Sequence, residues 1–173
     1  MKTIVVNLIG GPGIGKTTLF HHIIGNLKEK GLEVEMAAEY VKDLVWEESF
    51  KKIENQLHIL GRQHNRLFRV NGKVQVIVTD SPLLNSIVYF KGKNPHFKEM
   101  VLWEFNQMHN INYLFERSFK YNNVGRYQDE NGAIEIDGLF LSLLESKNIP
   151  YKTIKPGIES LDIIINDVLK SIE

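Results

Sequence analysis

The chain has 173 residues, of which 43% are hydrophobic and 24% charged, and its 21 basic and 21 acidic residues cancel. These values are typical of one globular domain, and the zero net charge argues weakly against a protein that coats nucleic acid electrostatically. The absence of cysteine excludes disulfides, thiolate catalysis and cysteine-ligated zinc, and favours a cytoplasmic location. No stretch has the length and character of a membrane span or signal peptide, so we expect no membrane partner.

Strand and helix patterns alternate along the chain. Apolar, β-branched segments predict strands at residues 3–9, 33–37, 73–79, 111–115 and 151–154. Helical spacing of apolar residues predicts helices at 16–30, 39–46, 50–69, 96–109, 134–146 and 158–172, with a short one ending at 90. This order predicts an α/β fold, a five-stranded, mostly parallel sheet with helices on both faces, in a single domain over 1–173. The loops after the first four strands then meet at one edge, where ligands bind.

Residues 10–17 read GGPGIGKT and match G-x-x-x-x-G-K-[ST] between a predicted strand and a predicted helix. Backbone amides of such a loop converge on phosphates at a helix N-terminus, so the motif predicts a P-loop NTPase fold. Lys16 is expected to reach the terminal phosphates of ATP and Thr17 to offer its hydroxyl to Mg²⁺. The expected nucleotide-binding residues are Gly11, Pro12, Gly13, Ile14, Gly15, Lys16, Thr17 and Thr18.

Two carboxylates follow predicted strands at the same edge of the sheet. Glu39, after the second strand, could take a proton from an attacking hydroxyl, or could begin a helix. Asp80, after the third strand, could ligate Mg²⁺, act as the general base, or cap the helix that follows. The sequence leaves the division of these roles open.

Polar residues 117–132 follow the fourth strand and are predicted to form a small lid. Arg117 and Arg126 are its candidate catalytic residues, because a closing arginine stabilises charge on a migrating phosphoryl group. The alternative is an ordinary charged surface loop. On another predicted helix, Arg62, Arg66 and Arg69 form a basic face that would receive phosphate or nucleic acid, or would simply be solvated.

Several of these segments resemble the NadR-like P-loop kinases, which include the nicotinamide riboside kinase domain of bacterial NadR proteins. The matching parts are GGPGIGKTT, Ala38-Glu39-Tyr40, Gly61-Arg62-Gln63, Thr79-Asp80 and Gly125-Arg126. The resemblance implies an ATP-dependent kinase fold with a carboxylate beside the acceptor hydroxyl (Glu39 or Asp80) and a lid arginine (Arg126). We expect the chain to be the kinase module alone. Compact members of this broad family also look like phage-encoded kinases that act on nucleotides or on hydroxymethylated pyrimidines in DNA. The resemblance therefore implies DNA as a second possible class of phosphate acceptor.

The residues and the resemblance together predict an ATP- and Mg²⁺-dependent phosphotransferase that acts on a hydroxyl of a nucleoside, nucleotide or related small molecule. One alternative is phosphorylation of a hydroxymethylated pyrimidine, such as 5-hydroxymethyluridine, in DNA. An alternative from another class is a nucleotide-dependent binding or switch ATPase, although no guanine-reading N-K-x-D sequence is present. An oligomeric motor ATPase is a third. No obligatory protein partner is evident from the sequence.

Overall fold

The computed structural model describes residues 2–118 and 128–172 of the chain. These residues form one five-stranded sheet in the order β2-β3-β1-β4-β5. All strand pairs in it are parallel, which confirms the predicted α/β P-loop fold. The sequence predicted a mostly parallel sheet, and the sheet is parallel throughout. The strands are β1 (Ile4–Ile9), β2 (Val34–Ala37), β3 (Val76–Thr79), β4 (His109–Phe115) and β5 (Lys152–Ile154).

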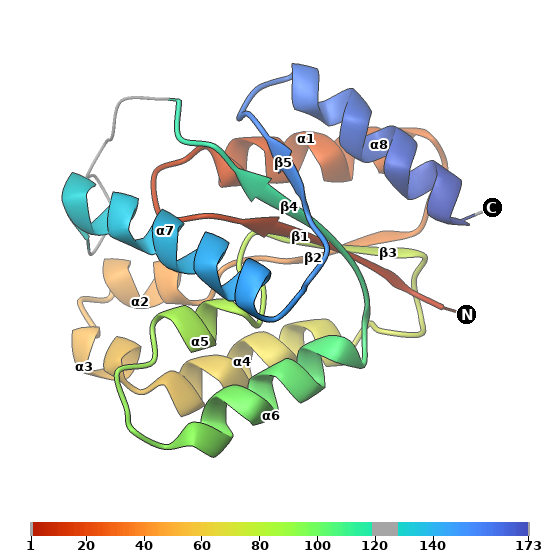
Figure 1. The fold of residues 1–173 in the computed structure, drawn as a ribbon. Coiled ribbons are helices and arrows are strands. Elements are labelled where there is room, and N and C mark those ends of the chain that lie inside the picture. The colour runs from red at the N-terminus through yellow and green to blue at the C-terminus, as the bar shows by residue number, and fades with distance from the viewer. Residues whose placement is uncertain (1, 119–127, 173) are drawn as a thin grey trace.

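Helices connect the strands and cover both faces of the sheet (Figure 1). None of the described helices has the length and apolar character that a membrane crossing requires. Their bounds are α1 (Lys16–Glu29), α2 (Val41–Trp46), α3 (Phe50–Glu54), α4 (Gln56–Phe68), α5 (Asn85–Val88), α6 (Pro95–Asn106), α7 (Glu130–Ser146) and α8 (Glu159–Ile172).

The central strand β1 is buried along its whole length because both of its faces are covered. Ile4, Val6 and Leu8 pack into the core that α1 and α8 close. Val5 and Ile9 point the other way, into the core shared with α4, α5, α6 and α7. This double burial explains why the strand is an almost unbroken apolar run, and it anchors the loop that follows.

A polar cluster ties the last helix to the sheet. The hydroxyl of Tyr113 in β4 donates to a carboxylate oxygen of Asp167 in α8 at 2.8 Å, and Lys152 in β5 pairs with the same carboxylate at 2.6 Å. Burial raises the pKa of Asp167, but the hydrogen bonds from Lys152 and Tyr113 outweigh this and hold the pKa below its ordinary value. Burial, and then the bond to Asp167, raises the pKa of Tyr113 well above its ordinary value.

Several helix boundaries differ from the sequence prediction: α2 begins at Val41 rather than 39, and α6 ends at Asn106 rather than 109, where β4 already begins. Two further differences are explained by side-chain caps. The single helix predicted over 50–69 is two helices, because Asn55 leaves helical geometry and its side chain accepts a hydrogen bond from the His58 amide at 3.2 Å. The helix predicted from residue 134 begins at Glu130, where Asp129 accepts a bond from the Gly132 amide at 2.8 Å. Residues 130–132, predicted to end the lid, are therefore helical. Side-chain caps set both boundaries.

Candidate active site

Four loops meet at the carboxyl edge of the sheet. The phosphate loop follows β1, Glu39 lies two residues after β2, Asp80 directly follows β3, and Arg117 lies two residues after β4. Because β3 lies between β2 and β1, Asp80 is placed between Glu39 and the loop. The sheet brings together the ends of these four strands, as the sequence predicted.

The phosphate loop is held open by glycine geometry and by one apolar anchor. Gly13 and Gly15 have φ values of 75° and 93°, a region that residues with a Cβ rarely adopt. Ile14 between them is 1% exposed and packs in the core, so it can offer a ligand only its backbone. No side chain caps α1, whose first residue is Lys16. The amides of its first turn are therefore available to an anion.

Lys16 lies back across the loop that precedes it. Its Nζ donates to the carbonyl oxygens of Gly10 and Gly11, each at 2.7 Å. Burial lowers the pKa of Lys16, and the carboxylates of Glu39 and Asp80 offset part of that effect. Desolvation of this ammonium strengthens any interaction that it makes with an anion.

An ion pair from the other side of the sheet braces the loop. Asp137 in α7 accepts a hydrogen bond from the Gly11 amide at 2.6 Å and one from Arg117 Nε at 2.7 Å. Arg117 Nη2 also donates to the Pro12 carbonyl at 3.0 Å. A Cβ on Gly11 would lie 2.6 Å from the Ala133 carbonyl oxygen, so only glycine allows this contact. Asp137 was not among the site residues predicted from sequence, because nothing local distinguishes it from a surface carboxylate of a helix.

Asp80 joins the loop to the end of β2. One carboxylate oxygen accepts from the Thr17 hydroxyl at 3.0 Å, and the other accepts from the Glu39 amide at 3.0 Å. Asp80 is only 4% exposed. Among the described residues, no group of three or more His, Cys, Asp or Glu could hold a metal. The hydroxyl of Thr17 and the carboxylate of Asp80 are nonetheless the hard oxygen donors that Mg²⁺ accepts when phosphates and water complete its shell.

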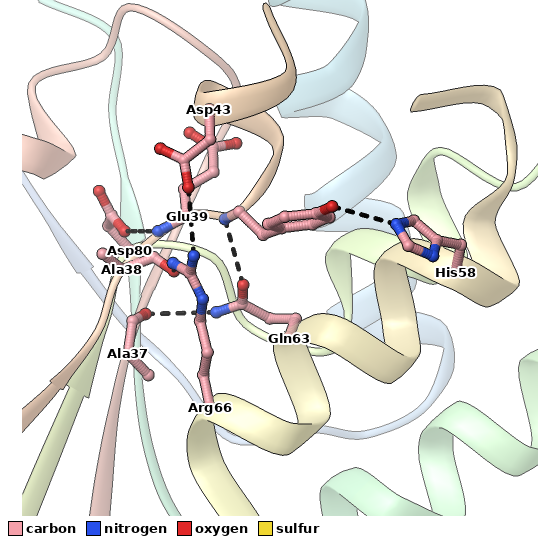
Figure 2. A network of polar contacts seen from close by, with 9 residues as sticks. Ala37, Ala38, Glu39, Asp43, His58, Gln63, Arg66 and Asp80 are labelled. Atoms are coloured by element: carbon pink, nitrogen blue, oxygen red, sulfur yellow. Dashed lines mark hydrogen bonds and ion pairs between the residues drawn. The ribbon is translucent and has the colours of Figure 1, made fainter. Parts of the chain in front are cut away.

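Two side chains of α4 fix the segment that carries Glu39 (Figure 2). Gln63 donates to the Ala37 carbonyl at 3.2 Å and accepts from the Tyr40 amide at 3.4 Å. Arg66 Nη1 donates to the Ala38 carbonyl at 2.6 Å. Gln63 is 3% exposed although it is polar. Its place on the apolar face of a helix and in the Gly61-Arg62-Gln63 segment were the sequence signals for its importance, but neither predicted these contacts.

A cavity of about 200 Å³ opens beside the loop and continues between α2, α3, α4 and α5. Lys16, Thr17 and Glu39 line the end where the loop lies. The rest of the wall combines apolar residues with uncharged polar ones. The described lining residues are Gly10, Pro12, Gly13, Gly15, Lys16, Thr17, Thr18, Glu39, Val41, Lys42, Val45, Ile53, Gln56, Ile59, Gln63, Ser81, Pro82, Asn85, Ser86, Tyr89 and Gln128.

The remaining predicted residues fall into two groups. Pro12 and Thr18 line the cavity, whereas Gly11 is not among its lining residues and donates its amide to Asp137. Arg126 and most of the predicted lid lie outside the described residues, so the lid and its arginine stay predictions.

Solved structures with a similar fold include two NadR complexes and a thymidylate kinase. NadR in complex with NAD and AMP-PNP matches with a TM-score of 0.70 at 14% identity, over 95% of this chain and 49% of that chain. NadR in complex with NR matches with a TM-score of 0.64 at 15% identity, over 95% of this chain and 51% of that one. Thymidylate kinase from Ehrlichia chaffeensis matches with a TM-score of 0.60 at 12% identity, over the full length of both chains. The chain thus spans about half the length of the NadR chains that it matches, and its fold is that of a P-loop kinase.

Comparison with curated proteins gives no significant match. The model of a family described as an AAA domain matches residues 5–160, which is most of the chain. This match and the NadR structures confirm the resemblance to NadR-like P-loop proteins that the sequence motifs indicated. The chain belongs to this AAA domain family.

Proposed function

We propose that this protein transfers the γ-phosphate of ATP, with Mg²⁺, to a hydroxyl of a nucleoside-like acceptor. The observation that carries the proposal is the cavity, which has a phosphate loop and a carboxylate at one end and a mixed apolar and amide wall beyond. A donor phosphate on Lys16 and an acceptor hydroxyl at Glu39 would then face one another. Phosphoryl transfer depends mainly on such positioning and on charge stabilisation.

The donor site rests on the loop amides and on Lys16. Phosphate oxygens would replace the Gly10 and Gly11 carbonyl oxygens as partners of Lys16 Nζ, which turns a charge–dipole contact into a charge–charge contact. The NadR structure that shares this fold contains AMP-PNP, which supports ATP as the donor here. When bound, Mg²⁺ would be held by Thr17 and Asp80 and would neutralise charge on the phosphates.

The contacts of Asp80 support a division of labour between the two carboxylates. Both oxygens of Asp80 already accept hydrogen bonds, from Thr17 and from the Glu39 amide, so Asp80 is suited to a metal-side and positioning role. Glu39 lines the cavity and is held by the Asp80 bond to its amide. We therefore assign the acceptor proton to Glu39.

Two arginines complete the proposed machinery. Arg117 contacts Asp137 and the Pro12 carbonyl, a position from which it holds the loop in shape beside the migrating phosphate. Arg126, in the proposed lid over 117–132 of one kinase domain, would supply the closing charge.

The cavity wall supports an uncharged acceptor over a nucleoside monophosphate. No arginine is among the described lining residues, and Lys42 is the single cation there besides Lys16. Asn85 donates to the Ser81 hydroxyl at 3.1 Å, while its buried Oδ1 has no partner among the described residues. The uncharged polar side chains of the wall, such as Gln56 and Ser86, can pair with hydroxyl groups of an acceptor but offer no charge to a phosphate.

Transfer of radiolabelled phosphate from ATP tests the proposal directly. The acceptor panel consists of nucleosides, their monophosphates, nicotinamide riboside and DNA that contains hydroxymethylated pyrimidines. We expect label on a nucleoside and not on its monophosphate, with no label for Lys16→Ala. If every acceptor stays unlabelled while ATP still binds, the kinase assignment is wrong, and slow hydrolysis unaffected by acceptors would favour a switch ATPase.

Separate Glu39→Gln and Asp80→Asn variants test the division of labour. Glu39→Gln should lower kcat by on the order of a hundredfold and leave the Mg²⁺ requirement unchanged. Asp80→Asn should shift the Mg²⁺ titration. The reverse pattern would exchange the two roles without touching the kinase assignment.

A further inference from the structure

A second hollow lies on the outer side of the segment that carries Glu39. It has a volume of about 310 Å³ and lies between α4 and β2, which is the edge strand of the sheet. It shares no described lining residue with the acceptor cavity. Its lining consists of Met36, Ala38, Arg62, Asn65, Arg66 and Arg69, which we call the arginine groove.

The three arginines of the groove lie on one face of α4 and make that face positively charged. They stand at positions i, i+4 and i+7 of α4, with Arg69 directly after its last residue, so they share a face and extend over about 10 Å of helix axis. No carboxylate is among the described lining residues. Of the three, Arg66 alone has an ion pair within the described part of the chain, to Asp43 at 3.2 Å, and that carboxylate is 59% exposed.

Two of the guanidinium groups are held in place before any ligand arrives. Arg66 donates to the Ala38 carbonyl and, with Arg62, lies over the ring of Tyr40, at 5.6 Å and 5.1 Å from its centroid. Figure 2 shows Arg66 extended between the end of β2 and Asp43. An arginine fixed in this way loses little side-chain entropy on binding, and its planar fork matches two oxygens of one phosphate.

We propose that the arginine groove is a second anion site, which binds phosphate groups of a nucleic acid strand or of a free nucleotide separately from the phosphate loop. The groove is long enough to contact more than one phosphate, and Arg62 and Arg69 provide charge that no carboxylate of the described chain neutralises. This proposal does not depend on the proposed transfer reaction, since groove binding is measurable without turnover.

The test uses the full chain with AMP-PNP and Mg²⁺ at saturating concentration, so that the phosphate loop is filled. Fluorescence anisotropy then follows a labelled single-stranded DNA dodecamer, with AMP, inorganic polyphosphate and a twelve-residue glutamate peptide as competitors. The test variant is Arg62→Gln with Arg69→Gln, both exposed positions, while Arg66 is kept because it holds Ala38. The matched control is Lys98→Gln with Lys147→Gln, two exposed lysines on other parts of the surface.

We expect the test variant to weaken DNA binding about tenfold or more at low salt and to reduce the slope of log affinity against log salt by about 1.4, the equivalent of two phosphates. The control variant should bind as the wild type does. Competition by polyphosphate but not by AMP identifies a strand site, and equal competition by AMP identifies a nucleotide site. The proposal is overturned if nothing binds, if the control loses as much affinity as the test variant, or if the glutamate peptide competes as well as DNA.

Discussion

The ion pair between Asp137 and Arg117 allows the sharpest prediction about the phosphate loop. The two side chains are 21% and 15% exposed, and Asp137 receives one bond from Arg117 and one from the Gly11 amide. Asp137→Asn preserves shape and can still accept from Gly11, but it removes the charge and turns its amide group toward Arg117. A charge-assisted hydrogen bond is worth about 1.5–3 kcal/mol, so we expect a loss of about 2 kcal/mol in the free energy of unfolding.

For a chain of this size, that loss corresponds to a fall in Tm of about 4–8 °C. Differential scanning calorimetry measures it, and a nucleotide titration should show weaker ATP binding because the loop loses its brace. Asp162→Asn, the same substitution at an exposed position of α8, is the matched control and should change Tm by less than about 2 °C. A double variant with Arg117→Gln should cost less than the sum of the two single changes. An Asp137→Asn protein that melts with the wild type would refute the brace.

Four further outcomes follow from the site and the core. Lys16→Ala should abolish transfer with little change in Tm, because the burial of its ammonium offsets the stabilisation from its bonds to the Gly10 and Gly11 carbonyls; calorimetry beside the transfer assay checks both. Asp80→Asn should raise the Mg²⁺ concentration for half-maximal transfer by about tenfold or more, and an unchanged titration would argue against the metal role. Gln63→Leu should cost about 1–3 kcal/mol and lower kcat, since it releases the end of β2; a stable, fully active variant would contradict this. The lowered pKa of Asp167 means that its carboxylate stabilises the fold above the ordinary carboxyl pKa, and that this stabilisation is lost as the pH falls through the pKa of the folded state. The Tm difference between wild type and Asp167→Asn should therefore be largest at neutral pH and shrink below about pH 4. A difference that does not change with pH would count against this role of Asp167.

Patterns that depend on neighbours in the chain were readable from the sequence. The five strands, the phosphate loop and the α/β order follow from local apolar runs, glycines and helical spacing, and all five predicted strands are present in the sheet. The capping roles of Asn55 and Asp129 are also local, but their residue types occur in many loops, so these two helix boundaries were misplaced.

The supports of the site were decided by tertiary structure alone. Gly11 and Asp137 are 126 positions apart, and Tyr40 and Gln63 are 23 apart, so no local pattern could have paired them. A glutamine, an arginine or an aspartate on a helix is ordinarily a surface residue, and only the packing of α4 and α7 against the sheet turns these side chains toward the loops. The amino-acid sequence by itself determined which groups could bind phosphate, because a glycine-rich phosphate loop requires only the strand before it and the helix after it. The partners of those groups were decided by the tertiary structure. The strand order places Asp80 between the phosphate loop and Glu39, where its carboxylate contacts both.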